Sequence, residues 1–178
     1  GTYSQLKKTA QAVFFIYIIK WLSFTVNRVI PAKTKLHMDT SFLTELNWLA
    51  VAVATVAYFM LGAIWYSKIL FANSWIRATG VDMSKQDAKK GVGGIMALTF
   101  VLEFVICIGL GILVYRLNLT GGVMAGIKLG LMTGVCFAAT TITISYLYQT
   151  KPRSLSFIDG GYHVAGNILA AVILCLWQ

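Results

Sequence analysis

The sequence lacks the signature motifs of catalysis and of metal binding. It contains no G-x-S-x-G, no phosphate-binding G-x-x-x-x-G-K-[ST], no H-E-x-x-H and no dinucleotide fingerprint following a strand. Cys107, Cys136 and Cys175 each stand alone in an apolar run, which is typical of small buried side chains rather than of disulfides or zinc ligands. We predict no enzyme activity, no cofactor and no metal; a lipid-modifying enzyme ranks third among the functions considered.

Charged residues are also scarce. They make up 12% of the 178 residues, whereas 58% of the residues are hydrophobic, and an ordinary soluble domain carries about twice that charge. The formal net charge of +9 comes from 15 basic and 6 acidic residues. Because the basic residues lie between apolar runs and not on one surface with aromatics, we predict a lipid bilayer as the partner and no nucleic acid.

Long apolar runs predict four transmembrane helices, since about 20 apolar residues are needed to cross a bilayer. The expected spans are residues 46–67, 91–115, 123–149 and 157–177. The sequence thus predicts an all-α, polytopic membrane protein, a compact antiparallel bundle of four transmembrane helices. The short connection at 116–122 predicts that the second and third spans pack as an antiparallel pair.

Residues 1–37 differ from the rest in charge, because they hold six basic residues and no acidic one. Met38 stands just ahead of the first clean span. We expect residues 1–37 to be a separable extension (a tag, an upstream translation or a native part) and residues 38–178 to form the transmembrane domain. The apolar run 12–26, interrupted by Lys20, is shorter than a span; an extra anchoring helix, an interfacial helix and an artefact of the start site are its alternatives.

The distribution of basic residues predicts the orientation. The loop 68–90 carries five of them and the turn 149–156 carries two, against Arg116 and Lys128 on the other side. The positive-inside rule places both of these loops in the cytoplasm. Aromatic rings near span ends predict an interfacial belt, with a short interfacial segment around Phe71 and Trp75. The belt consists of Trp48, Trp65, Tyr66, Trp75 and Trp177.

The third span carries a stripe of minimal side chains. At every fourth position stand Gly122, Gly126, Gly130, Gly134 and Ala138. Such a ridge lets another helix approach almost backbone to backbone, so we expect the packing centre of the bundle here. At 100° per residue, Thr133, Thr140 and Thr141 fall on the same face and add hydroxyl groups to it.

The fourth span is amphipathic in a different way. Asp159, His163 and Asn167 share one stripe, and Lys151 or Arg153 is the expected partner of Asp159. For His163, a neutral ring bonded to Asp159 or to a backbone carbonyl is favoured over a metal or proton-relay role. The opposite face is aliphatic and is expected to contact lipid. It consists of Ile168, Leu169, Val172 and Leu176.

Glu103, at the centre of the second span, is the residue most indicative of function. A carboxylate at the bilayer centre costs several kcal/mol and normally faces a partner or a water-filled path. Two interpretations have equal weight. Glu103 belongs to a polar layer that serves transport, or it is protonated and clasps helices as a neutral hydrogen-bonding group. The expected layer comprises Glu103, His163, Asn167, Asp159, Thr140 and Thr141, with Thr55 or Tyr58 as further neighbours.

Several short segments carry a resemblance to a known family. They are Asn47-Trp48-Leu49-Ala50-Val51, Gly62-Ala63-Ile64-Trp65-Tyr66-Ser67, Leu129-Gly130, Thr140-Thr141, Ile158-Asp159 and Gly161-Tyr162. In order and spacing the chain resembles, from about Leu46 to Trp177, the bacterial membrane-protein family called domain of unknown function 1761. The resemblance implies a four-helix protein of unassigned function in the bacterial cytoplasmic (inner) membrane, and it supplies no catalytic residues.

Two functional hypotheses follow. In the first, the protein binds or passes a small solute or protons through its polar layer, as a homo-oligomer because four helices enclose little volume. In the second, it is a structural or accessory membrane protein whose polar groups only fix helix packing. The solute is not specified by the sequence.

Overall fold

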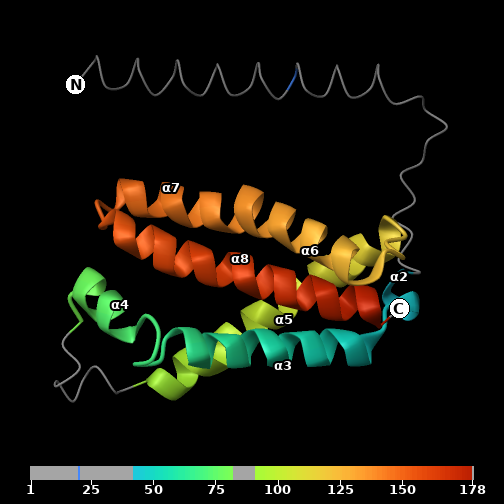
Figure 1. Cartoon of the computed structure of the whole chain (residues 1–178), viewed down its shortest axis with the longest axis horizontal. Helices are drawn as coiled ribbons and strands as arrows, with labels where there is room; N and C mark the ends of the chain where they lie inside the picture. Colours follow the sequence, from blue (N-terminus) through green and yellow to red (C-terminus); the bar gives the residue numbers. More distant parts are fainter. Residues whose placement is uncertain (1–19, 21–41, 82–90, 178) are drawn as a thin grey trace. The chain divides into compact units, whose positions relative to one another are not determined.

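The computed structural model describes residue 20, residues 42–81 and residues 91–177 (Figure 1). Backbone contacts divide the chain into Gly1–Thr40 and Ser41–Gln178, and the second unit is described below. Apart from Lys20, the extension 1–37 and the run 12–26 lie outside the described residues, so their nature stays a prediction. Throughout the described part of the second unit, all regular structure is helical, which confirms the all-α prediction.

Four helical segments are long and apolar enough to cross a membrane. They agree with the four predicted spans. In chain order the elements are α2 (Phe42–Glu45), α3 (Trp48–Trp65), α4 (Ala72–Thr79), α5 (Val92–Arg116), α6 (Gly122–Thr133), η2 (Gly134–Ala139), α7 (Thr140–Tyr148) and α8 (Arg153–Leu176). The third span consists of α6, η2 and α7. Helix α8 begins four residues earlier than predicted, because Pro152, with φ −64° and ψ 142°, is its N-cap and sets the entry to the helix.

The spans alternate in direction, so the bundle has two ends. At the Trp177 end, α3 and α6 begin and α5 and α8 finish; at the Trp65 end, α3 and α7 finish and α5 and α8 begin. Asn47 fastens the Trp177 end. Its Oδ1 accepts from the backbone N–H of Ala50 at 3.0 Å, and its Nδ2 donates to the carbonyl of Trp177 at 2.8 Å.

Helix α8 is the centre of the bundle. It packs against α3, α4, α5, α6, η2 and α7, and Figure 1 shows it between α3 and the third span. Half of the residues in its apolar stretch are buried, against 28% of the residues in the corresponding stretch of each other span. The third span packs along α8, whereas α5 packs against α3 and α8. The predicted pairing of the second and third spans is therefore wrong, because the small side chains of the third span allow a closer approach to α8.

The glycine ridge makes this contact. Gly126, Gly130 and Gly134 lie against the backbone of Val172, Ile168 and Val164, respectively. A Cβ on Gly134 would stand 2.7 Å from the Cα of Val164, and one on Gly130 would stand 2.6 Å from the carbonyl oxygen of Asn167. No real side chain fits at such distances, so only glycine permits this packing. Two of the residues expected to face lipid, Ile168 and Val172, instead form the surface against which the ridge packs.

A π-helical turn, η2, changes the ridge beyond Gly134. A π-turn adds one residue to the helical turn, so positions after it rotate by one place. The next small residue seen against α8 is Ala139, one place beyond the predicted Ala138; its Cβ would lie 3.2 Å from a Cβ on Gly160. At the other end of the ridge, Gly122 has φ +57° and a Cβ there would lie 4.0 Å from Leu176. The ridge proper is thus Gly126, Gly130 and Gly134.

Helix α4 lies at the Trp65 end and packs on α8. It occupies the stretch where a short interfacial segment around Phe71 and Trp75 was predicted; the segment is helical, and its place at the membrane interface stays a prediction. It ends at Gly80, whose φ of +69° requires the left-handed region, and the Gly80 N–H closes the last turn on the carbonyl of Ile76 at 2.9 Å.

Candidate functional site: a polar layer inside the bundle

Glu103 lies inside the bundle, on α5, with 2% of its surface exposed. Its Oε1 accepts a hydrogen bond from the hydroxyl of Tyr162 on α8. Its Oε2 is buried and has no hydrogen-bond partner among the described residues. Nearly all buried polar atoms in native proteins are bonded, so Oε2 is an exception that calls for an explanation.

A second set of polar groups forms a chain across three helices. The hydroxyl of Thr133 on α6 lies 3.2 Å from Asn167 Oδ1 on α8, and Asn167 Nδ2 lies 3.2 Å from the hydroxyl of Tyr58 on α3. The Tyr58 hydroxyl in turn lies 2.9 Å from Nδ1 of His163, one turn before Asn167. If Tyr58 donates to Nδ1, the proton of a neutral His163 ring is on Nε2. Asn167 Nδ2 also donates to the carbonyl of His163 at 2.7 Å.

Aromatic rings join the two sets. Tyr58 and Tyr162 meet edge to face with ring centroids 5.5 Å apart, and Tyr162 lies 4.8 Å from the His163 ring. Space for Tyr58 comes from Gly166, where any Cβ would overlap the phenol ring. The two sets together contain six residues, and from here on these six, not the predicted set, are called the polar layer. They are Tyr58, Glu103, Thr133, Tyr162, His163 and Asn167.

A second group of side chains, which we call the Asp159 cluster, lies nearer the Trp65 end and consists of Asp159, Tyr66 and Tyr146. Asp159 is 9% exposed; its Oδ1 accepts from the hydroxyl of Tyr66 at 2.8 Å, and its Oδ2 accepts from that of Tyr146 at 2.6 Å. Two phenols thus hold this side chain in place of the expected Lys151 or Arg153. Tyr66 lies just beyond the end of α3, where burial and then the nearby Asp159 raise its pKa above the ordinary value.

The comparison with protein families bears on this site. A family model described as a protein of unknown function, DUF1761, matches residues 49–175. The chain belongs to the DUF1761 family. Comparison with curated proteins and with solved structures gives no significant match. The match confirms the resemblance found in the sequence, and it covers every member of the polar layer.

In this DUF1761 chain, Glu103, His163 and Asn167 come together as expected, but two other predicted members do not join them. Thr140 and Thr141 are exposed on the third span. The hydroxyl of Thr140 donates to the carbonyl of Val135 at 2.8 Å, five residues back, a bond that accompanies the π-turn. The rotation introduced by η2 carries both threonines off the face on which a regular helix would place them. Asp159 lies about 12 Å from Asn167 along α8, in its own cluster.

The aromatic belt residues lie at the two ends of the bundle. Trp48 and Trp177 are each 44% exposed at the Trp177 end, whereas Trp65, Tyr66 and Trp75 are half-buried at the Trp65 end. Trp65 Nε1 donates to the carbonyl of Ile158 at 3.0 Å, and the Tyr66 hydroxyl binds Asp159. These two rings therefore also tie α3 to α8.

Sequence reasoning missed the direct partner of Glu103. Tyr162 was noted only as part of the Gly161-Tyr162 motif of the family, although it lies next to His163 on α8. A helical wheel separates neighbouring residues by 100°, so Tyr162 fell outside the polar stripe. The signal was the motif itself, since a tyrosine beside small residues in a span has room to reach across a helix interface. Thr133 was likewise placed on the glycine face without being assigned a partner.

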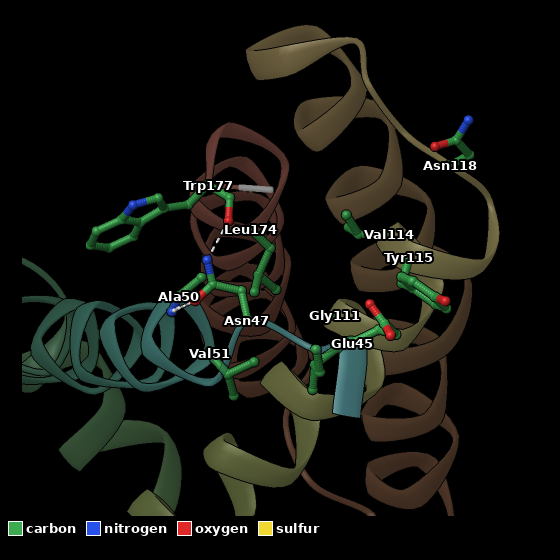
Figure 2. A pocket seen from close by; sticks show the side chains of 11 residues that line it. Glu45, Asn47, Ala50, Val51, Gly111, Val114, Tyr115, Asn118, Leu174 and Trp177 are labelled. Carbon is green, nitrogen blue, oxygen red and sulfur yellow. Dashed lines mark hydrogen bonds between the residues drawn. The ribbon is translucent and has the colours of Figure 1, made fainter. Parts of the chain in front are cut away.

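A pocket of about 210 Å³ lies at the Trp177 end (Figure 2). Its deeper wall includes Val51, Gly111 and Leu174, and its rim includes Glu45 and Tyr115. Gly111 is eight residues from Glu103, about 12 Å along α5. Val51 and Cys107 are fully buried, and both stand on the elements that run from this pocket toward Glu103. The pocket therefore does not reach the polar layer.

Metal binding finds no support in the geometry. Within residues 42–81 and 91–177, no three side chains of His, Cys, Asp or Glu gather as a metal site would require. His163 is bonded through Nδ1 to Tyr58, and the two oxygens of Asp159 are each bonded to a tyrosine. Asp159 and His163, one turn apart on α8, are thus engaged by two separate sets of phenol contacts.

Proposed function

We propose that the protein is a proton-binding membrane protein that passes protons through Glu103, in the cytoplasmic membrane of a bacterium with loops 68–90 and 149–156 in the cytoplasm. The observation that carries the proposal is Glu103 Oε2, buried and without a hydrogen-bond partner among the described residues. As a carboxylate oxygen it lacks a donor, and as the oxygen of an acid O–H it lacks an acceptor. Either state calls for a partner other than the described side chains, and water or hydronium is the smallest group that could supply it.

Phenols and carboxyl groups continue from Glu103 toward the Trp65 end. Tyr162 binds Glu103, the ring of Tyr66 lies 5.4 Å from that of Tyr162, and Tyr66 binds Asp159. Oxygen groups of this kind support proton transfer once water joins them. A proton needs no open lumen, so the proposal favours protons over a larger solute. The homo-oligomer stays a prediction, and a proton path does not require it.

The alternative is a structural or accessory protein, which is favoured by the chain Thr133, Asn167, Tyr58 and His163. Each of these side chains has a partner on another helix, as expected of groups that fix helix register. Under this alternative Glu103 is a protonated clasp. A glutamine would replace it with little effect.

Proton flux into proteoliposomes distinguishes the two functions. The purified full chain is reconstituted around an internal pH-sensitive dye, and a pH step is applied outside. We expect faster equilibration than in empty liposomes for the wild type, and a rate equal to that of empty liposomes for Glu103→Gln. Glu45→Gln makes the same change on an exposed acid and should keep the wild-type rate.

A spectroscopic readout keeps the test independent of reconstitution. Difference infrared spectra over a pH series should show the carbonyl stretch of a protonated carboxylic acid, and this band should be missing in Glu103→Gln. A folded Glu103→Gln variant with the wild-type flux, or a wild type no faster than empty liposomes, would rule out proton passage and favour the structural function.

A further inference from the structure

A second cavity lies between the third span and α8, on the side of α8 away from Glu103. It is a groove of about 700 Å³, a volume typical of sites for small ligands. One wall comes from η2 and α7 and includes Val135 and Ile144; the other comes from α8 and includes Phe157 and Ile168. Most of its lining is aliphatic or aromatic. No residue of α7 is buried, so this wall is open to the surroundings.

The groove has a basic end. Lys151 and Arg153, both exposed, line it where the turn joins α7 to α8, and no acidic residue is among its lining residues. The nearest acid on α8, Asp159, is engaged by two tyrosines. The site therefore offers two positive charges at the Trp65 end and an apolar channel leading away from them toward the middle of the bundle.

The dimensions fit one leaflet of a bilayer. From Arg153 to Ile168 the groove follows α8 for about 22 Å, and half of a bilayer core is about 15 Å thick. A chain entering at the headgroup level would therefore find an apolar wall along its whole length. Basic pockets between transmembrane helices at the interface are the kind of site that holds anionic lipid headgroups.

We propose that this groove binds one anionic phospholipid of the leaflet at the Trp65 end, with its phosphate between Lys151 and Arg153 and an acyl chain between α7 and α8. The site is separate from Glu103, so it stands whether or not the protein passes protons. It assigns a ligand to a surface that the polar layer does not use.

Native mass spectrometry of the full chain tests the proposal. The protein is taken up in mild detergent with equal amounts of phosphatidylglycerol and phosphatidylcholine, and retained lipids are counted. We expect one phosphatidylglycerol to be retained about 25-fold in preference to phosphatidylcholine, since each of the two basic residues contributes about fivefold. Each of Lys151→Ala and Arg153→Ala should lower that preference by about fivefold, the effect of one basic residue at a membrane surface. Lys128→Ala, at an exposed basic residue outside the groove, should leave it unchanged.

A second variant tests the apolar part. Ala165→Leu puts a larger side chain into the groove and should reduce retention of both lipids, whereas Ala52→Leu, at an exposed site on α3, should not. Equal retention of the two lipids by the wild type would overturn the proposal, as would wild-type preference in the Lys151→Ala, Arg153→Ala double variant. A protein dimer abolished by Ala165→Leu would show that a second copy occupies the groove instead.

Discussion

The two faces of α8 are built on different principles. Toward the third span, α8 presents its own backbone, and Gly126, Gly130 and Gly134 approach it without any intervening side chain. Toward α3 and α5, it presents Tyr162, His163 and Asn167, which reach across to Tyr58 and Glu103. The first interface is built on close van der Waals packing, and two hydrogen bonds, from Thr133 to Asn167 and from Tyr146 to Asp159, cross it beside the glycines. The second depends on hydrogen bonds that must be satisfied one by one.

Glycine serves both faces, but in opposite ways. On the third span its missing side chain brings two helix backbones together. On α8, the missing side chain of Gly166 leaves room for the Tyr58 ring, which occupies the place that a side chain would take. We infer that the glycine ridge of the third span fixes the position of α8. That position in turn brings Tyr162, His163 and Asn167 within reach of Tyr58 and Glu103. Perturbing each face in turn tests this division.

The largest effect is expected from Gly130→Leu. A side chain there would collide with the backbone of Ile168 and Asn167, which cannot move without displacing α8. We expect a loss of at least about 3 kcal/mol in the free energy of unfolding, and failure to assemble at physiological temperature. Yield of monodisperse protein and thermal unfolding in detergent measure this. Gly109→Leu is the matched control, since nothing lies within 4 Å of a Cβ at Gly109. Normal assembly of Gly130→Leu would show that the ridge does not position α8.

Gly166→Ala should have the next largest effect. The added methyl would displace the Tyr58 ring and break its bonds to His163 and Asn167. We expect a cost of about 2 kcal/mol, measured by thermal unfolding, and almost none for Gly109→Ala. In a Tyr58→Leu background the same substitution should cost much less, because the ring is gone. An equal cost in both backgrounds would contradict the assigned role of Gly166.

Asn167→Ala removes the central member of the hydrogen-bonded chain. A single interhelical hydrogen bond in a membrane protein contributes about 0.6 kcal/mol on average. Asn167 bonds to Thr133, to Tyr58 and to the carbonyl of His163, so we expect a loss of about 1.5 kcal/mol. Thr99→Ala is the control, because the hydroxyl of Thr99 bonds only within its own helix, to the carbonyl of Ile95. Equal stability of the two variants would mean that the polar face contributes nothing beyond its packing.

Much of this arrangement was predictable, since long apolar runs specify spans and every-fourth glycines specify a contact. Glu103, His163 and Asn167 could be grouped by depth, because a polar residue in a span must find a partner inside the bundle. What the glycine ridge would pack against was not predictable. The short connection after Arg116 favoured α5, whereas the ridge fits the backbone of α8.

The π-turn explains the other misplaced residues. A helical wheel assumes 100° at every step, and η2 breaks that assumption between Gly134 and Ala139. Before the turn, Gly126 and Gly130 make the expected close helix contact, whereas after it the small residue against Gly160 is Ala139, and Thr140 and Thr141 are exposed. No residue type announces a π-turn, so the sequence could not have corrected the wheel.

The smallest effect is expected at the edge of the polar face, from Tyr66→Phe. Its hydroxyl donates to Asp159, and its loss should cost about 1 kcal/mol at neutral pH.

Because burial and Asp159 raise the pKa of Tyr66, the folded protein keeps this proton at alkaline pH where the unfolded chain loses it. The stabilisation is present below about pH 10 and declines above it, with a slope of up to 1.4 kcal/mol per pH unit. Unfolding over an alkaline series should therefore show a shallower decline for Tyr66→Phe than for Tyr148→Phe, which alters an exposed tyrosine at the same end. Parallel curves for the two variants would mean that the hydrogen bond from Tyr66 to Asp159 does not contribute to the stability of the folded protein.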